Sequence, residues 1–396
     1  MPSPEVSPPP LKRRRISDPS SQRTHHPPPP LPQILPPTAS YDPPSTFPVD
    51  HLTIYSWNIN GIAPFLPPST PPITNFLKPA SRSTTPSNPT PQRPSLRANL
   101  KRWKWPHILC LQEVKIAPTD TKTQSSVRRV VNAPLDADDE DNDSDRPLYD
   151  AHFCLPRDQH NATGFGGKVY GVCTLLRRDV PGPVTRTVQW DLEGRVLLVE
   201  IAEWGVVVVN VYAVNGTTND YRDSATGKVL GDRHGRKRVF HSLLRDEVRR
   251  YEDAGWGVVI AGDMNVSRSF VDSFPQLRMG EEHVRNRTDF EVKFRKDLGM
   301  VDTFRLVHGQ QRKFTYRPRN KPWGTGGDRV DMILVTKGLR AQGRVREADV
   351  LDDEEERGPS DHVPLFVELA VGRVERGDGG SGQGAPAIDE QGEKSG

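Results

Sequence analysis

The chain has 396 residues, a formal net charge of +3, 34% hydrophobic residues and 39 prolines. So low an apolar fraction excludes a chain that is ordered throughout, because many of the prolines cluster in segments that cannot build a core. No apolar stretch approaches the roughly 20 residues of a membrane-spanning helix. The three cysteines form neither a disulfide framework nor a metal-type spacing. We therefore expect no membrane association and reduced thiols.

Four segments have a composition that is typical of disorder or of loops. They are a Pro-rich tail at residues 1–49, a Pro/Ser-rich insertion at about 64–95, an acidic loop at about 132–146 and a Gly-rich tail at 372–396. Such segments cannot bury enough apolar surface to offset the entropy of ordering. The remaining pattern predicts one domain, residues 50–371, that carries both insertions.

A basic run, Lys12-Arg13-Arg14-Arg15, lies within the first tail. Short runs of this kind serve as nuclear import signals, but they also occur as solvated basic patches. The first interpretation predicts a protein of the nucleus.

Apolar runs with β-branched and aromatic residues predict a series of strands. The runs cover residues 52–57, 105–113, 169–176, 196–201, 206–212, 257–262, 314–316, 330–335 and 363–369. Apolar residues recur at helical spacing over 238–251 and 290–298, which predicts two helices. Many strands with a few helices indicate an α/β domain.

Polar side chains stand at the ends of these strands, where a rigid sheet presents catalytic groups. They are Asn58, Asn60, Gln112, Glu113, Tyr212, Asn215, Asp263, Asn265, Asp331, Asp361 and His362. Carboxylates and carboxamides with one histidine, and without cysteine, suit a hard cation such as Mg²⁺. A metal held by carboxylates beside a candidate His–Asp pair can hydrolyse a phosphodiester.

Each short motif also has a structural interpretation. Ser360-Asp361 can cap a helix, Asn58 can stabilise a turn, and His362 can be an ordinary surface histidine. The basic segment 233–238 can contact nucleic acid, or it can be a solvated loop and helix start. The functional interpretation depends on the motifs occurring together in one order.

That order resembles the motif set of the exonuclease III-type abasic-site endonucleases, within the endonuclease/exonuclease/phosphatase superfamily. The motifs are Trp57-Asn58-Ile59-Asn60-Gly61, Leu111-Gln112-Glu113-Val114-Lys115, Asn210-Val211-Tyr212-Ala213-Val214-Asn215-Gly216, Gly262-Asp263-Met264-Asn265-Val266, Arg329-Val330-Asp331 and Ser360-Asp361-His362-Val363-Pro364. The resemblance spans about residues 52–369. It implies a four-layer α/β sandwich, in which two packed β-sheets are flanked by helices.

The resemblance also implies residue roles. A Mg²⁺ site, with Mn²⁺ as a substitute ion, is expected among Asn58, Glu113, Asp263, Asn265, Asp361 and His362. The expected catalytic residues are Tyr212, Asp263, Asn265, Asp331 and His362. Asp331 would orient His362, and either Asp263 or His362 would take the proton of the attacking water. Asn215, Phe314 and Trp323 are expected to bind substrate.

Two departures from the family concern substrate binding. Asp328 stands where a tryptophan often precedes the arginine, and the segment after Gly216 carries no basic wedge residue. The resemblance implies a monomeric enzyme of base excision repair that binds double-stranded DNA with abasic sites or blocked 3′ ends. It would cut 5′ to the lesion, leave a 3′-hydroxyl and trim 3′ ends.

Three alternatives stay open. The same fold can act as a 3′-exonuclease, or on another phosphodiester, such as a tyrosyl-DNA, RNA or small-molecule substrate. The chain can also be a catalytically dead module that binds DNA. Intact Glu113, Asp263, Asp331 and His362 count against this last alternative.

Overall fold

The computed structural model describes residues 34, 51–67, 94–135, 146–162 and 170–371. The segments 1–33, 35–50 and 372–396 lie outside the described residues, as do most of the two predicted insertions. The predictions of disordered tails, of looped insertions and of an import signal at residues 12–15 therefore fall outside the described part of the chain.

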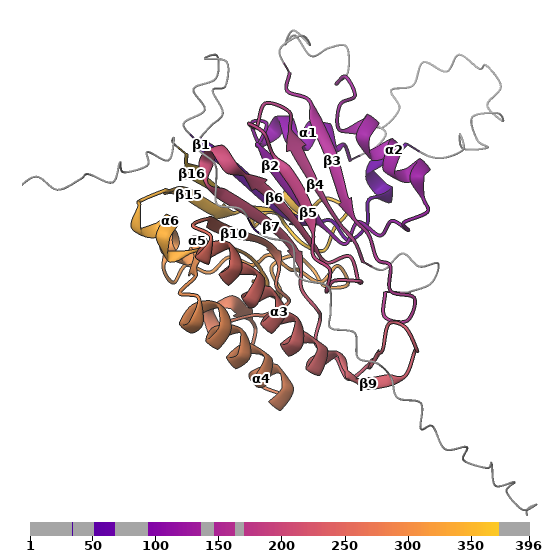
Figure 1. The fold of residues 1–396 in the computed structure, drawn as a ribbon, viewed down its shortest axis with the longest axis vertical. Helices are drawn as coiled ribbons and strands as arrows, with labels where there is room; N and C mark the ends of the chain where they lie inside the picture. Colours follow the sequence, from indigo (N-terminus) through magenta and orange to yellow (C-terminus); the bar gives the residue numbers. More distant parts are fainter. Residues whose placement is uncertain (1–33, 35–50, 68–93, 136–145, 163–169, 372–396) are drawn as a thin grey trace, which may run out of the picture. The chain divides into compact units, whose positions relative to one another are not determined.

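Two mixed six-stranded β-sheets lie at the centre of the described part (Figure 1). The first sheet has the strand order β15 (Val345–Val350), β16 (Leu365–Ala370), β1 (His51–Asn58), β2 (Ile108–Gln112), β4 (Val172–Arg177) and β3 (Tyr149–Cys154). The second has the order β12 (Val301–Asp302), β14 (Asp331–Val335), β10 (Gly257–Asp263), β7 (Val206–Tyr212), β6 (Val196–Ile201) and β5 (Val184–Thr187). Short pairs join β8 (Asp220–Arg222) to β9 (Val229–Asp232), and β11 (Ser273–Phe274) to β13 (Gly327–Asp328).

The strand β7 shows why the sheets pack in layers. Val206 and Val208 face the aliphatic core between the two sheets, which also holds Ile54 of β1. Val207 and Val209, which alternate with them, belong to a second core on the opposite face of the same strand. Because both faces of β7 are buried, its sequence is a nearly unbroken valine run rather than an alternation of apolar and polar residues.

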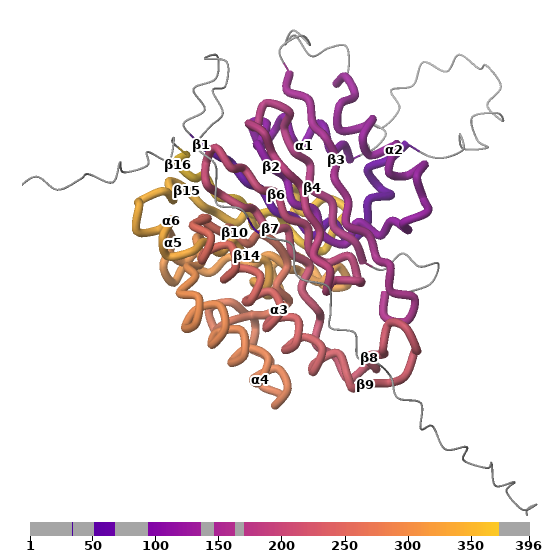
Figure 2. The backbone as a smooth tube through the Cα atoms, in the orientation of Figure 1, coloured from indigo at the N-terminus to yellow at the C-terminus, as the bar shows by residue number. Residues whose placement is uncertain are grey.

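Helices cover the outer faces of the two sheets. The second sheet is covered by α3 (Arg233–Asp253) and by α4 (Glu281–Phe290), which continues into the π-helix Glu291–Asp297. α3 and α4 run side by side in Figure 2. The first is covered by α1 (Leu96–Arg102) and α2 (Thr121–Val130). Three shorter helices are α5 (Thr303–His308), α6 (Lys337–Ala341) and α7 (Glu354–Arg357). This arrangement of helix, sheet, sheet and helix confirms the predicted four-layer α/β sandwich.

Some predicted elements differ from the observed ones. The helix predicted at 290–298 begins at Glu281, because the first turns of α4 are mostly polar and carry no apolar period. The strand predicted at 314–316 is absent from the described elements, since Tyr316 forms only isolated bridges with Asp328 and His362. The helix predicted at 238–251 begins earlier, at Arg233, where the Asp232 carboxylate accepts a hydrogen bond from the Gly235 amide.

Candidate active site

The ends of strands from both sheets meet at one place. Asn58 ends β1, and its side-chain amide donates hydrogen bonds of 3.0 Å to Glu113 Oε1 and of 3.0 Å to Asp263 Oδ2. The parallel pairing of β7 with β10 sets Tyr212 beside Asp263. The antiparallel pairing of β10 with β14 sets Asp331 opposite Asp263. Asn58 therefore ties the carboxylates of the two sheets together.

Two of these residues have an uncommon backbone conformation. Glu113 has φ 52° and Asn265 has φ 51°, which lie in the left-handed region that few non-glycine residues adopt. The Asn265 backbone N–H donates to Asp263 Oδ1 at 2.8 Å, and its side-chain amide donates to the Ala213 carbonyl at 3.0 Å. Backbone strain that is held in this way is characteristic of functional sites.

His362 and Asp331 form a buried pair, in which His362 Nδ1 lies 2.7 Å from Asp331 Oδ2. The backbone of His362 is fixed as well, because its carbonyl accepts a hydrogen bond from Trp57 Nε1 at 2.9 Å. The Ser360 hydroxyl donates to the Asn58 carbonyl at 2.6 Å and accepts from the His362 amide at 3.0 Å. Ser360 thus locks the histidine segment to β1 and does not cap a helix.

The surroundings of Asp263 and His362 raise the pKa values of both side chains, for different reasons. Burial and the neighbouring Asp331 raise the pKa of Asp263 to about 7. Burial alone would lower the pKa of His362, but the charge and hydrogen bond of Asp331 outweigh it and raise the pKa to about 10. At neutral pH the imidazole is therefore protonated, whereas Asp263 is close to its titration point. Asp263 is then the better placed of the two to accept a proton from water.

The donor atoms at this site fit a hard divalent cation. Ligand atoms of Asp263, Asp331 and His362 all lie within 4.8 Å of one another. The protonated imidazole carries a hydrogen on both ring nitrogens, so the carboxylate oxygens would hold the cation, and coordination by His362 stays a prediction. Asp331 Oδ1 is buried and has no hydrogen-bond partner among the described residues, so it is free to bind a cation. Glu113 and Asp361 line the adjoining cavity and add further carboxylates. Such an oxygen-rich set suits Mg²⁺ or Mn²⁺.

Asn58 and Asn60 support these carboxylates through hydrogen bonds. The Asn58 side-chain oxygen accepts the Asn60 amide at 3.1 Å, so both ends of its carboxamide are engaged. The Asn60 carboxamide donates to Asp361 Oδ1 at 2.9 Å. The geometry therefore gives Asn58 an orienting function, and direct coordination by Asn58 stays a prediction.

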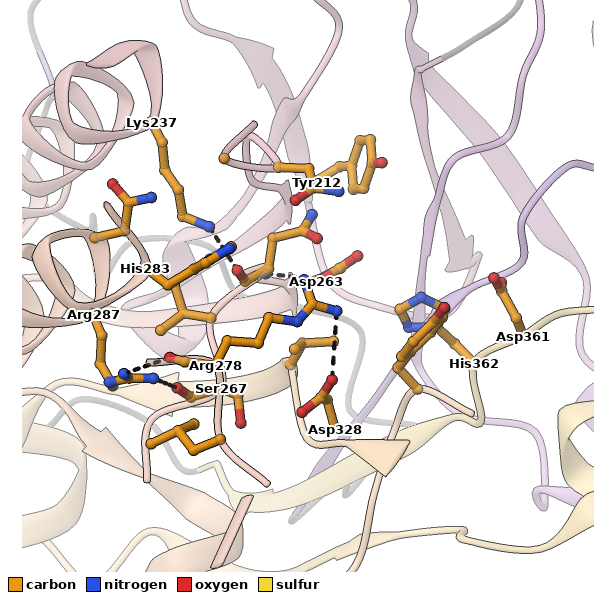
Figure 3. A pocket seen from close by; sticks show the side chains of 18 of the residues that line it. Tyr212, Lys237, Asp263, Ser267, Arg278, His283, Arg287, Asp328, Asp361 and His362 are labelled. Atoms are coloured by element: carbon orange, nitrogen blue, oxygen red, sulfur yellow. Dashed lines mark hydrogen bonds and ion pairs between the residues drawn. The ribbon is translucent and has the colours of Figure 1, made fainter. Parts of the chain in front are cut away.

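The site opens into a cavity of about 250 Å³ (Figure 3). Most of the predicted site residues line it: Glu113, Tyr212, Asn215, Asp263, Asn265, Asp361 and His362. Asn58 and Asp331 support this lining through their bonds to Asp263 and His362. The structure therefore brings together nearly all of the residues that the motifs indicated.

The two predicted substrate-binding aromatics lie apart from this cavity. Phe314 packs near Phe274, with 6.5 Å between ring centroids, and the Trp323 ring lies 4.4 Å from the Arg317 guanidinium. Neither belongs to the described lining, because each ring is held by neighbours of its own. The wall contains Tyr316 and Asp328 instead.

Four basic lining residues were not predicted: Lys237, Arg278, His283 and Arg287. Lys237 lies in the basic segment 233–238, for which the sequence allows either a nucleic-acid contact or a solvated loop and helix start. The helix start is confirmed, because α3 begins at Arg233. The solvated loop is wrong, because Arg233 and Arg236 are buried against Glu193 and Lys237 is 1% exposed. Contact with nucleic acid stays a prediction. The spacing held a signal, since Lys237 shares a helical face with the buried Phe240 and Leu244.

Comparison with known proteins identifies the family. Residues 55–362 match the model of the Endonuclease/Exonuclease/phosphatase family. The chain belongs to this family. The family comprises phosphodiester hydrolases that are typically metal-dependent, in keeping with the oxygen-rich donor set. None of the helices in the described ranges is sufficiently long and apolar to span a bilayer.

Two curated relatives of this family member have distant sequence similarity. The chain is 27% identical over 232 residues to DNA-(apurinic or apyrimidinic site) endonuclease 2 of Saccharomyces cerevisiae. This alignment covers 47% of the chain and 41% of the yeast protein. It is 26% identical over 219 residues to exodeoxyribonuclease III of Haemophilus influenzae. That alignment covers 50% of the chain and 76% of the Haemophilus protein. The alignment thus spans only about two fifths of the yeast relative.

Solved structures of family members share the fold. The catalytic domain of Xenopus laevis APE2 superposes with a TM-score of 0.55 at 19% identity, over 83% of this chain and 94% of that one. The AP endonuclease of Leishmania major gives a TM-score of 0.55 at 18% identity, over 86% of this chain and 93% of the Leishmania chain. A Neisseria 3′ phosphatase bound to product DNA gives a TM-score of 0.50 at 20% identity, over 80% of this chain and 99% of the Neisseria chain.

Proposed function

We propose that this protein is a metal-dependent DNA phosphodiesterase of base excision repair, which cuts 5′ to an abasic site and leaves a 3′-hydroxyl. The observation that carries the proposal is the pairing of a protonated His362 with Asp331, next to an Asp263 that titrates near neutrality. Hydrolysis of a phosphodiester needs a base for the attacking water and positive charge for the phosphate. Asp263 would supply the base, and the protonated His362 would supply positive charge.

Each residue has a defined task in this proposal. Asp263 accepts the proton of the attacking water, and Asn265 hydrogen-bonds the reacting phosphate. His362 donates a hydrogen bond to a non-bridging phosphate oxygen and is held in place by Asp331. A divalent cation, when bound among the carboxylates, neutralises the charge of the phosphate.

Tyr212 adds a neutral hydrogen-bond donor. Burial and the nearby Glu113 carboxylate raise the pKa of Tyr212 well above its usual value. The phenol therefore keeps its proton over the physiological pH range, and it can donate that proton to a phosphate oxygen.

The choice of DNA as substrate is supported by relatives. The yeast relative is named as an endonuclease for apurinic or apyrimidinic sites, the Haemophilus relative as an exodeoxyribonuclease. The Neisseria structure contains product DNA. Action in the nucleus as a monomer completes the proposal, and the nuclear location rests on the basic run at residues 12–15 alone.

A 3′-end exonuclease is the second candidate, and one feature of the cavity favours it. The wall carries Asp328, Arg278 and His283, whereas Phe314 and Trp323 pack elsewhere. An apolar wall suits a bare abasic sugar, whereas a polar wall suits an intact nucleotide with a base or phosphate to bind.

A panel of matched duplexes tests both candidates. The purified full-length chain with Mg²⁺ is given a duplex with an abasic analogue, one with a 3′-blocked nick and one that is intact. Fastest cleavage 5′ to the abasic analogue supports the first proposal, and fastest release from 3′ ends supports the second. If none of the duplexes is cut by protein that still binds DNA, both are refuted in favour of a binding module.

A further inference from the structure

The cavity carries opposite charges at its two ends. Asp361 lies beside His362 at one end in Figure 3, the metal end, and Glu113 is tied to Asp263 through the Asn58 side chain. Lys237, Arg278, His283 and Arg287 line the other end. Figure 3 shows Lys237, His283 and Arg287 on the far side of Asp263 from Asp361 and His362, and the Arg278 side chain reaching from that side toward Asp328.

The basic end has few negative partners of its own. Lys237 is 1% exposed, and its ammonium donates to the Asn265 backbone carbonyl at 2.6 Å. Arg287 donates to the backbone carbonyls of Ser267 at 3.1 Å and Arg278 at 3.0 Å. Within the described ranges, neither Lys237 nor Arg287 forms an ion pair. Burial lowers the pKa of Lys237 to about 7, and a bound anion would favour its charged form.

Neighbouring arginines of the same region are paired. Arg285, two positions before Arg287 on α4, forms ion pairs with Glu281 and Glu282. Arg238, next to Lys237 on α3, binds Glu282 at 2.7 Å. Lys237 and Arg287, which face the cavity, therefore lack the carboxylate partners that their neighbours Arg238 and Arg285 have.

The basic end is also held rigidly. Lys237 extends from α3, and His283 and Arg287 lie one turn apart on the adjacent α4. The two hydrogen bonds of Arg287 fasten the loop that carries Arg278 to α4. Arg278 is the adaptable member, since its side chain is 61% exposed and its contact with Asp328 is 3.7 Å long.

We propose that Lys237, Arg278, His283 and Arg287 bind a second phosphate of the substrate strand, next to the phosphate that is cut. The proposal rests on the proposed function and names the feature of the substrate that this end recognises. Arginine and lysine together are suited to phosphate oxygens, which are charged acceptors with no protons to donate. A strand that places its scissile phosphate at the metal end and a neighbouring phosphate at the basic end would match the charges of both ends of the cavity.

The test neutralises one phosphate at a time. The duplex that the wild-type chain cleaves best is compared with two versions that carry a methylphosphonate, which is uncharged, at the phosphate 5′ or 3′ of the scissile one. We expect one of the two versions to lower kcat/KM by about tenfold or more, the size of a lost charge-assisted hydrogen bond. Equal rates for all three duplexes would overturn this proposal and leave the phosphodiesterase proposal intact.

Variants then assign the effect to residues. Arg278→Ala should lower kcat/KM on the native duplex by about tenfold, and it should have little effect on the sensitive methylphosphonate duplex. Lys237→Met should give the same two results. If this substitution of a buried residue unfolds the chain, the test rests on Arg278→Ala, whose side chain is exposed. Arg285→Ala, from the same helix but ion-paired outside the cavity, is the matched control and should act as wild type. An equal loss on both duplexes for Arg278→Ala would overturn the assignment.

Discussion

His362 Nδ1 and Asp331 Oδ2 lie 2.7 Å apart in the buried floor of the site, and the two residues are 31 positions apart in the chain. Asp331 also lies opposite Asp263 across the β10–β14 ladder. The orientation and charge of His362 therefore depend on a strand that contacts the catalytic aspartate directly.

Loss of either partner should disable the pair as a whole. Asp331→Ala and His362→Ala should each lower kcat by roughly 10²–10⁴-fold, the usual worth of a positioned acid–base group. The double variant should be little slower than the slower single variant, because the two side chains act as one unit. Single-turnover rates on the best duplex measure this. Losses that multiply in the double variant would mean that the residues act independently.

The rate should depend on pH in a bell shape. Asp263 must be deprotonated to accept a proton, so kcat/KM should rise with pH up to about 7, the pKa of Asp263. His362 must be protonated to donate, so the rate should fall above about 10, the pKa of His362. A pH–rate profile measures both limbs.

His362→Gln should change both limbs of that profile in a defined direction. The alkaline limb should vanish, because glutamine does not titrate. The acid limb should move to higher pH, since the charge of His362 lowers the pKa of Asp263 in the wild-type chain. An unchanged alkaline limb in this variant would show that another group is responsible for it.

Glu193 is predicted to be a main support of the fold behind Tyr212. It is buried and pairs with Arg195 at 3.0 Å, Arg233 at 2.6 Å and Arg236 at 3.1 Å. Glu193→Gln should lower the free energy of unfolding by about 3–5 kcal/mol, because buried guanidinium groups lose their counter-charge. Asp150→Asn, in an exposed pair with Arg178, should cost less than about 1 kcal/mol. Urea unfolding of both variants measures the difference, and equal losses would contradict it.

The Glu193 carboxylate should also make the free energy of unfolding depend on pH. Burial opposes ionisation of Glu193, but the three arginines outweigh it and lower its pKa to about 2. A folded-state pKa below the unfolded value of roughly 4.3 adds stability above that value, and this stability is lost as pH falls toward 2. Between pH 6 and pH 3 the Glu193→Gln variant should therefore lose less stability than the wild type.

Metal affinity should depend on Glu113. Glu113→Ala removes a carboxylate that lines the cavity and accepts a hydrogen bond from Asn58. The Mg²⁺ concentration for half-maximal activity should therefore rise by about tenfold or more. Direct titration with Mn²⁺ checks the same point without an activity readout. Wild-type affinity in Glu113→Ala would exclude Glu113 as a ligand.

Much of the site could be predicted from sequence because it is encoded at strand ends. Asp263 and Glu113 directly follow buried apolar runs, so local pattern alone indicated that the sheet edge presents them. The pairing of Asp331 with His362 came only from the resemblance, since no local pattern links residues that far apart. Burial raises the pKa of Asp263 and the neighbouring Asp331 raises the pKa of His362, and the sequence alone displays neither cause.

The basic end of the cavity could not be predicted in the same way. Arg287 lies on α4, whose polar sequence has no apolar period, and Arg278 lies in a loop before it. The structure does not place Phe314 and Trp323 in the described lining of this cavity, so their contact with substrate stays a prediction. Phe314 and Trp323 satisfy their rings against Phe274 and Arg317, and residue type alone does not distinguish such packing from ligand binding.

The most direct measurement is the single-turnover cleavage rate of an abasic-site duplex by the wild-type chain and by Asp263→Asn, each with Mg²⁺ and with EDTA. Our account predicts cleavage by the wild type with Mg²⁺, none with EDTA, and a rate at least about 10²-fold lower for Asp263→Asn, whose amide cannot accept the proton. DNA binding should be retained by the variant, because the phosphate contacts remain. Wild-type cleavage by Asp263→Asn, or equal rates in EDTA, would contradict a metal-dependent hydrolysis at this site.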